Sequence, residues 1–345
     1  MKDWHLIRYA LTHDWALVPE KIADLMGMLA FHASGGHHTP EQLAAFTGGG
    51  APSPSRGGSV AVLPLRGVIA HRGGMVSEAS GGASVEAFAA QFRAVMADDS
   101  VRAVVLDVDS PGGTVAGCQE IVAEMLAARG TKPVVAVANS MMCSAAYWIA
   151  SAADEIVSTP SGTVGSIGVF SVHQDLSAAL DKEGVKTTMI SAGKFKTAGN
   201  PFEPLSDEER AVIQTRVDTA YAQFVKDVAA GRGVSASDVR SGYGEGRALT
   251  AKDAKAAGMI DRIATLDETL ARLTSPGGRS KVGPLRAEFD GEKMVVMGDA
   301  EVSRPFAEAK PSLLEVEKRL HDMAESVEPY GEQSKIGSPF PVMGL

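Results

Sequence analysis

The strongest constraint on the fold is a repeated change between strand-like and helical hydrophobic patterns in the middle of the chain. Near-continuous apolar runs, typical of strands buried on both faces, alternate with runs of helical periodicity. The strand-like runs are residues 59–65, 102–108, 133–138, 155–158 and 185–190, and the helical runs are residues 85–97, 115–128, 144–152 and 206–230. Strands that alternate with helices form a parallel sheet covered by helices, so the pattern predicts an α/β fold.

Two breaks rich in Gly, Pro and Ser separate this central region from its flanks. Residues 47–58 read TGGGAPSPSRGG, which predicts a flexible linker, and SPGG at 275–278 ends the central region. We therefore expect a helical N-terminal unit at 1–46, a main domain at 59–275 and a mostly irregular tail at 276–345.

Each flank holds one helical pattern. Pro19 and Glu20 are typical of a helix start. The apolar residues that then share one helix face are Ile22, Leu25, Met26 and Leu29. A heptad-like spacing in the tail relates Leu313, Val316, Leu320, Met323 and Val327. Because it spans only about two heptads, a scaffold-like or oligomerisation segment and an amphipathic helix on its own domain stay open.

Composition excludes several classes of protein. The formal net charge of −9, with no basic run, argues against a nucleic-acid surface. The only cysteines are Cys118 and Cys143, which favours a reducing compartment over a disulfide scaffold. Residues 133–153 carry no formal charge, but a buried strand followed by a buried helix explains them better than a membrane span. With no secretory pattern at the start, we expect a cytoplasmic protein that binds no membrane.

A glycine-containing segment directly follows the second strand-like run. It reads Asp109-Ser110-Pro111-Gly112-Gly113 and precedes a helical run. Glycines at the carboxyl end of a parallel strand let backbone N–H groups approach a ligand, and such groups can stabilise the oxyanion of acyl transfer. The alternative is a tight strand-to-helix turn, because Pro-Gly is common in turns.

A serine stands where the third strand-like run gives way to a helical run. Ser144 lies among small residues, and at such a junction its hydroxyl can point into a cleft. The alternative is a helix N-cap, for which serine is a favoured residue. Cys143 is a weaker candidate nucleophile, because no histidine lies near it in the sequence and free cysteines are usually small buried hydrophobes.

Two lysines, Lys194 and Lys196, stand in a loop-like segment between glycines at residues 193–199. A lysine in a loop is usually a solvated charge. It acts as a general base only when it is neutral near pH 7, which requires burial.

Other catalytic patterns are missing from the sequence. It has no G-x-S-x-G elbow, no Walker or dinucleotide fingerprint, and no paired histidines except His37-His38 in a glycine-rich stretch. We therefore expect neither a cofactor nor a metal ion.

Five segments, taken in order, resemble the signal peptide peptidase A family of Ser–Lys serine proteases. They are DSPGG at 109–113, CSAAYW at 143–148, TVGSIGV at 163–169, GKFKTAGNPF at 193–202 and GRALTAKDAKAAGMID at 246–261. The resemblance covers roughly residues 59–273. It implies a serine endopeptidase with a crotonase/Clp-protease-like fold, a parallel sheet with covering helices.

By position, the resemblance implies that Ser144 is the nucleophile and Lys196 its general base, with Lys194 as the runner-up. Gly112 and Gly113 match the glycines of the oxyanion hole, and Gly113 is the better match for the N–H donor. Cys143 departs from the family, where a small residue such as Ser, Ala or Gly is usual. Family members form rings whose catalytic groups can come from neighbouring subunits, so a homo-oligomer is also implied.

The flanks indicate a branch of this family. The stretch DWALVPEK at 14–21 is similar to the leader of phage and prophage head maturation proteases, also called protein C. That branch implies a capsid assembly protease that cleaves scaffold, portal or capsid proteins, in the host cytoplasm or on a procapsid. The alternatives are a soluble bacterial peptidase that degrades signal peptides or misfolded proteins, and a non-catalytic assembly protein. An acyl-CoA enzyme of the crotonase type would leave the Ser–Lys pair unexplained.

Overall fold

The computed structural model describes residues 13–33, 36, 39, 55–57, 59–73, 82–275, 286–289 and 294–297. All of them belong to the first of the two compact units into which the chain divides, residues 1–300. The second unit, residues 301–345, lies outside the described residues, and so does the heptad-like spacing. The predicted domain boundaries and the nature of the tail therefore stay predictions.

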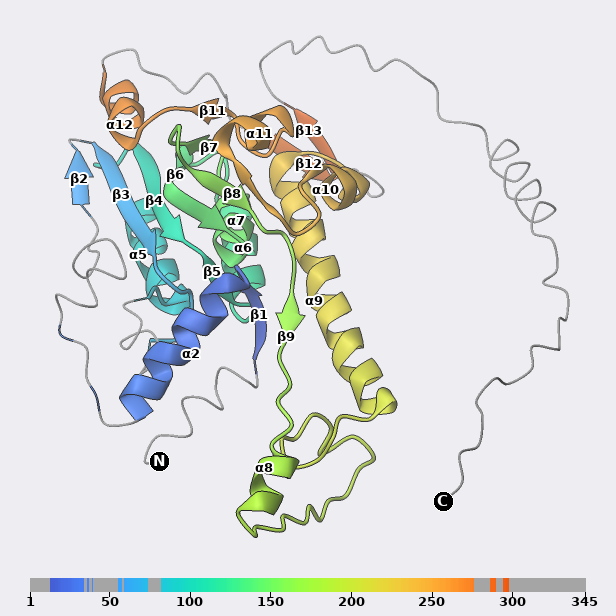
Figure 1. Ribbon diagram of the computed structural model, residues 1–345. Coiled ribbons are helices and arrows are strands. Elements are labelled where there is room, and N and C mark those ends of the chain that lie inside the picture. Colours follow the sequence, from blue (N-terminus) through green and yellow to red (C-terminus); the bar gives the residue numbers. More distant parts are fainter. Residues whose placement is uncertain are drawn as a thin grey trace, which may run out of the picture. The chain divides into compact units, whose positions relative to one another are not determined.

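The centre of the fold is an eight-stranded, mostly parallel sheet (Figure 1). Its strands are β2 (Ser55–Gly57), β3 (Val60–Arg66), β4 (Ala103–Ser110), β6 (Val134–Cys143), β7 (Glu155–Ser158), β8 (Thr163–Gly165), β10 (Ala248–Thr250) and β11 (Arg262–Ile263). Only β2 and β10 pair antiparallel, each at an edge. The long strand β6 has two successive neighbours in the sheet. Its first half pairs with β7, and its last three residues pair with β8.

The central strands are buried on both faces, which explains their near-continuous apolar sequences. In β4, Leu106 and Val108 belong to the main apolar cluster, whereas Ala103 and Val105 belong to a second cluster on the opposite face. This alternation is the two-residue period of a strand.

Helices cover both faces of the sheet. Those that contribute to the main cluster are α5 (Val85–Ala97), α6 (Cys118–Ala127), α7 (Ala145–Ala150), α9 (Asp207–Arg232), α10 (Ala236–Gly242) and α11 (Ala251–Ala256). The second cluster is closed by α12 (Leu266–Thr274), through Leu273. Only the C-terminal part of α9 is buried, from Phe224 onward, so its first half extends away from the sheet (Figure 1).

The short helix α7 is fixed by its contacts with α9. The Trp148 ring stacks on Phe224 with centroids 4.4 Å apart, and its Nε1 donates a 2.9 Å hydrogen bond to Asp227. At Gly231 the two helices touch through their backbones, because a Cβ there would collide with the carbonyl oxygen of Ser151. The middle and the end of α7 are therefore held against α9.

The α/β prediction is confirmed, and four of the five strand-like runs form strands. The uncharged stretch 133–153 is β6 followed by α7, as predicted, and none of the helices in the described ranges is long and apolar enough to cross a membrane. The strand predicted at 185–190 is wrong. These residues are irregular and no strand of the described chain lies beside them, so Ile190 is 96% exposed.

The N-terminal flank contains the predicted helix, α2 (Glu20–Ala33), with Leu25 and Leu29 buried. Before it lies an unpredicted strand, β1 (Asp14–Leu17), which pairs with two strands of the central region. The remaining elements are β5 (Gly112–Thr114), β9 (Phe170–Ser171), α8 (Ser177–Lys182), β12 (Arg286–Phe289) and β13 (Met294–Met297). β2 falls inside the predicted linker and pairs with β3.

Substitution Gly231→Ala should lower the free energy of unfolding by about 1–3 kcal/mol, because the added methyl group forces α9 away from α7. Gly242→Ala is the matched control. Its Cβ would meet no described atom within 4 Å beyond its own helix, so it should be neutral or stabilising by up to about 1 kcal/mol. Urea denaturation followed by circular dichroism measures both, and equal stability of the two variants would contradict the close contact.

Candidate active site

Ser144 occupies the sharp turn between β6 and α7. Its backbone has φ 54° and ψ −119°, a conformation that non-glycine residues rarely adopt. The turn is fixed on both sides, since the Ser144 N–H donates to the Gly165 carbonyl at 2.7 Å and its own carbonyl accepts from Trp148 N–H at 2.9 Å. Such strain costs about 1–3 kcal/mol and persists where the surroundings impose it, often at functional sites.

The N-cap interpretation of Ser144 is not supported. Its side chain makes no capping hydrogen bond, and its positive φ differs from the extended backbone usual at an N-cap. The hydroxyl is fully buried and has no hydrogen-bond partner among the described residues. A buried hydroxyl without a partner costs about 1–3 kcal/mol, so its retention favours a chemical role over a structural one.

Gly112 and Gly113 lie directly against this turn, in β5. Gly112 has φ 102°, and a Cβ there would lie 2.8 Å from Ser144 Cβ and 3.0 Å from the Ala145 nitrogen. A Cβ on Gly113 would collide with the Ile69 carbonyl oxygen. The predicted oxyanion glycines are thus brought to the predicted nucleophile, and a side chain at either position would push β5 away.

The backbone N–H groups at this point differ in their partners. Gly112 N–H donates to the Ser110 hydroxyl at 3.2 Å. The Gly112 carbonyl and the Thr114 N–H both form hydrogen bonds with Ile69, on one side of β5. Backbone groups alternate in direction along a strand, so the Gly113 N–H points to the opposite side of β5, toward β1. Ala145 N–H is at the first position of α7, where no acceptor exists within the helix. Neither Gly113 nor Ala145 thus uses its N–H as Gly112 does, in a hydrogen bond to the Ser110 hydroxyl.

Ala145 was missed by the sequence analysis, because a backbone amide has no residue-type signal. The available signal was its position directly after a candidate nucleophile, where an oxyanion-hole amide often lies.

The strands around this site are tied together by buried polar groups. Arg66 of β3 forms an ion pair with Asp107 of β4, which also accepts a 3.1 Å hydrogen bond from Asn139 Nδ2 of β6. Burial raises the pKa of Asp109 at the end of β4, partly offset by Arg66 and by a hydrogen bond from Ser140. These contacts fix the ends of the strands that carry the glycines and the serine.

Cys143 is unsuited to be the nucleophile. Its side chain is buried, and burial raises the pKa of its thiol to about 12. The reactive form of cysteine is the thiolate, which requires a lowered pKa.

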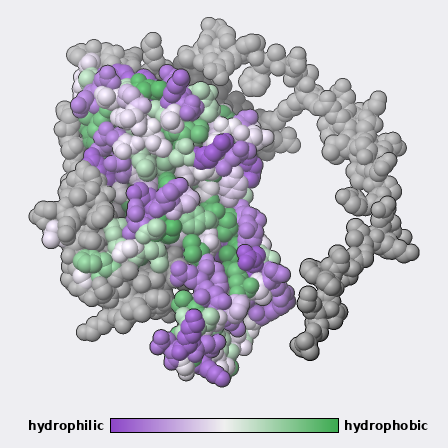
Figure 2. Space-filling view, viewed as in Figure 1, coloured by the Kyte–Doolittle hydropathy of each residue, from purple (hydrophilic) through white to green (hydrophobic). Residues whose placement is uncertain are grey.

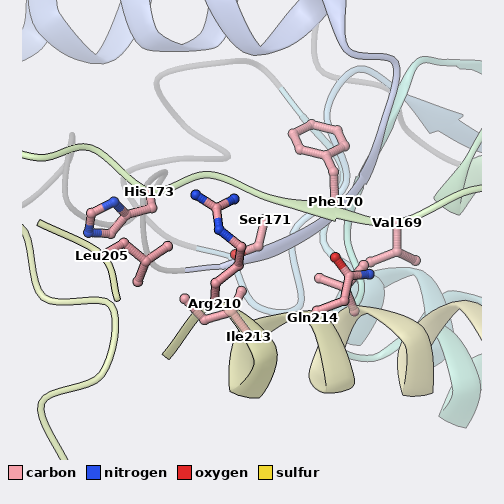
Figure 3. A pocket seen from close by; sticks show the side chains of 9 residues that line it. Val169, Phe170, Ser171, His173, Leu205, Arg210, Ile213 and Gln214 are labelled. Carbon is pink, nitrogen blue, oxygen red and sulfur yellow. The ribbon is translucent and has the colours of Figure 1, made fainter. Parts of the chain in front are cut away.

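Lys196 makes no hydrogen bond with Ser144, whose hydroxyl has no partner among the described residues. It lies in an excursion, residues 172–205, that extends from the sheet with α8 and returns at α9 (Figure 1). A cavity of about 410 Å³ lies between the root of the excursion and α9, lined among others by His173, Arg210 and Ile213 (Figure 3). The excursion therefore packs loosely on its own chain.

The two lysines differ in their surroundings. Lys194 forms an ion pair with Glu208 and lies 5.0 Å from the centre of the Phe195 ring. Lys196 is exposed, and its ammonium group has no ion pair or hydrogen bond with any described residue. Of the two, Lys196 is the one whose amine is free for another role.

Iodoacetamide at pH 8 should leave Cys143 and Cys118 unmodified in the folded protein. Burial raises the pKa of both thiols, so both remain protonated at this pH. Mass spectrometry of the alkylated protein measures this, and denaturation in guanidinium chloride should expose both to full labelling. Alkylation of Cys143 in the folded chain at pH 8 would contradict the assignment.

The segment that contains this site is similar to known proteins. Residues 127–277 match the sequence profile described as Peptidase family S49, a range that includes Ser144 and Lys196. The capsid assembly protease C of Escherichia phage lambda is 36% identical over 207 residues, covering 59% of this chain and 46% of the relative. The head-tail preconnector protein GP5 of Enterobacteria phage P21 is 34% identical, covering 63% and 43%.

A bacterial relative is similarly close. Protease 4 of Salmonella typhi is 33% identical, covering 63% of this chain and 34% of its own length. The chain thus spans less than half the length of these three relatives. Among solved structures, a mutant ClpP1 from Listeria monocytogenes aligns with a TM-score of 0.38 and 16% identity, covering 61% of this chain and 94% of the other. Residues 127–277 of the chain are therefore similar to peptidase family S49.

Proposed function

We propose that the chain is a serine endopeptidase in which Ser144 is the nucleophile. The observation that carries this proposal is the strained, buried Ser144 turn, with an unpartnered hydroxyl, lying against the glycine backbone of β5. The amides of Gly113 and Ala145 are proposed to hold the oxyanion, because preorganised N–H donors are among the largest contributions to acyl transfer. The names of the matched family, a peptidase family, and of the relative Protease 4 agree with this chemistry.

We propose Lys196 as the general base, supplied by a neighbouring subunit of a homo-oligomeric ring. The excursion carries exposed apolar side chains that its own chain does not cover, namely Val185, Met189, Ile190 and Phe195. On the face shown in Figure 2, hydrophobic residues also form a stripe beside β9 and the exposed half of α9. Contiguous exposed apolar surface of this kind marks protein interfaces.

The proposed reaction has two stages. Neutral Lys196 takes the proton of Ser144 as the hydroxyl oxygen attacks the scissile carbonyl, and the oxyanion accepts hydrogen bonds from Gly113 and Ala145. The protonated amine then gives its proton to the leaving amine, and water releases the acyl group by the same route. A general base must be neutral, and burial of a lysine amine disfavours its charged form. A subunit contact that buries the amine of Lys196 would therefore favour the neutral form.

The proposed substrates are scaffold, portal or capsid proteins of a phage or prophage, cut in the host cytoplasm or on a procapsid. Support comes from the two phage relatives, one of which is a capsid assembly protease by name. The similarity to Protease 4 favours a bacterial peptidase as the second candidate. The neighbouring genes distinguish the two candidate functions. Portal, terminase and capsid genes beside this gene would support the phage role, and the absence of such genes would support the bacterial role.

Ser144→Ala should abolish hydrolysis of denatured casein while leaving the circular dichroism spectrum unchanged and the unfolding midpoint no lower than that of wild type, because the lost hydroxyl is buried without a described partner. The serine hydroxyl is the atom that forms the acyl bond, so its loss should reduce the rate by about 10³-fold or more. Ser241→Ala, at an exposed position of α10, is the matched control and should keep full activity. Residual cleavage at the wild-type rate by the Ser144 variant would refute the nucleophile.

A subunit-mixing experiment should test whether the dyad forms between chains. Lys196→Met should inactivate the protein, whereas Lys194→Met should not. When inactive Ser144→Ala and Lys196→Met proteins are mixed under exchange conditions, sites that pair an intact serine with an intact lysine should restore about a quarter of wild-type activity. If the mixture stays inactive although native mass spectrometry shows mixed oligomers, the base does not come from a neighbour.

A further inference from the structure

The strand β1 lies between β5, which carries the candidate oxyanion glycines, and β9. It forms the middle of a three-stranded sheet in the order β5, β1, β9, and both pairings are antiparallel. The Val18 N–H donates to the Pro111 carbonyl at 2.9 Å, and the Val115 N–H donates to the Asp14 carbonyl at 3.1 Å. β1 thus runs across the whole length of β5.

The register of this pairing sets Ala16 at the candidate oxyanion hole. Ala16 is opposite Gly113 and lies two residues from both Asp14 and Val18, whose backbones form hydrogen bonds with the β5 side. Hydrogen-bonded pairs recur at every second residue of an antiparallel ladder, so Ala16 and Gly113 are also a hydrogen-bonded pair. The Gly113 N–H, proposed to bind the oxyanion, is therefore directed at the Ala16 carbonyl. The missing Cβ of Gly112 leaves room for that carbonyl oxygen on one side and for Ser144 Cβ on the other.

The side chains of β1 separate onto two faces. Trp15 and Leu17 belong to a small apolar cluster with Leu25 and Leu29 of α2. Ala16 points to the opposite face, is fully buried, and belongs to the main cluster of the domain. β1 and α2 are therefore joined by apolar packing, to which Val68 also contributes.

Among the described ion pairs, one involves a side chain of β1. Asp14 forms a 2.7 Å ion pair with Arg216 on the exposed half of α9, and its other oxygen, Oδ1, is buried without a described partner. An ion pair with a half-exposed arginine contributes little. Beyond Asp14, a groove of about 600 Å³ continues along α6 and α9, lined among others by Val115, Glu120 and Thr219.

We propose that β1 occupies the place of the substrate strand, as an internal inhibitory segment, and that extended peptides bind by replacing it. This inference rests on the proposed function, because it takes the place of β1 beside β5 and Ser144 as a peptide site. Main-chain bonds to β5 and β9 would hold a peptide of any sequence, as in other cases of strand addition. The position of Ala16 admits only a small side chain, so the substrate class is extended polypeptide with a small residue at that point.

A redox-switchable cross-link tests whether β1 must leave. Asp14 and Ser171 are register partners in antiparallel strands, so the pair Asp14→Cys and Ser171→Cys lies within disulfide range. The variant is made in the Ser144→Ala full chain, and binding of a fluorescein-labelled peptide with the sequence of residues 13–18 is followed by anisotropy. The oxidised protein should bind at least about tenfold more weakly than the same protein after reduction.

Controls separate the cross-link from the substitutions. Each single cysteine variant should bind the peptide equally with and without oxidant, because native Cys118 and Cys143 are buried. Arg216→Ala, which removes the ion pair to β1, should strengthen peptide binding several-fold. Equal binding by the oxidised and reduced double variant, with the cross-link verified by mass spectrometry, would overturn the inference.

The two proposals fail in different ways. If wild type hydrolyses no protein but the cross-link still switches peptide binding, the proposed function fails and the occupied groove stands. If wild type is active and the cross-link does not change peptide binding, the proposed function stands and the inhibitory role of β1 fails. For the substrate class, the same peptide carrying Ala16→Trp should show no measurable binding to the reduced protein, and equal binding of the two peptides would exclude a small-residue site.

Discussion

The close approach between the backbone of β5 and the turn at Ser144 is the contact on which the site depends. Gly112 makes it possible, since any side chain there would meet both the Ala16 carbonyl and Ser144 Cβ. On the other side of β5, Gly113 lies equally close to Ile69. The glycine strand is therefore clamped between two backbones. Its N–H groups have no freedom to reorient, which is the preorganisation that oxyanion stabilisation requires.

The strain at Ser144 is balanced by the packing around it. The end of β6 is bonded to β4 and β8, the serine N–H is fixed by Gly165, and α7 is fixed by the Trp148–Phe224 stack. Each of these contacts resists a different relaxation of the turn. A positive φ at a serine survives only when the surroundings over-determine it, and here the sheet and the long helix both contribute.

Much of the fold was predictable because its signals are carried by side chains. Runs of apolar residues identified β3, β4, β6 and β7, and the segments around Gly112 and Ser144 were identified by residue type. Residues 185–190 have the same β-branched composition, but a strand also needs a partner, which sequence does not reveal. β1 is only four residues long, and the role proposed for Ala145 is that of its backbone amide, so neither has a pattern that separates it from its neighbours.

The excursion that carries Lys196 and the proposed inhibitory strand β1 both adjoin β9 and α9. The excursion that carries Lys196 begins at β9 and returns at α9, while β1 is bonded to β9 and to Arg216 of α9. A neighbouring subunit that packs on the exposed half of α9, as proposed, would contact the elements that hold β1. A tethered strand competes at a high effective concentration, so free peptides would displace it poorly from an isolated subunit. Assembly would then both supply the base and weaken the inhibitory strand, and proteolysis would be confined to the assembled particle.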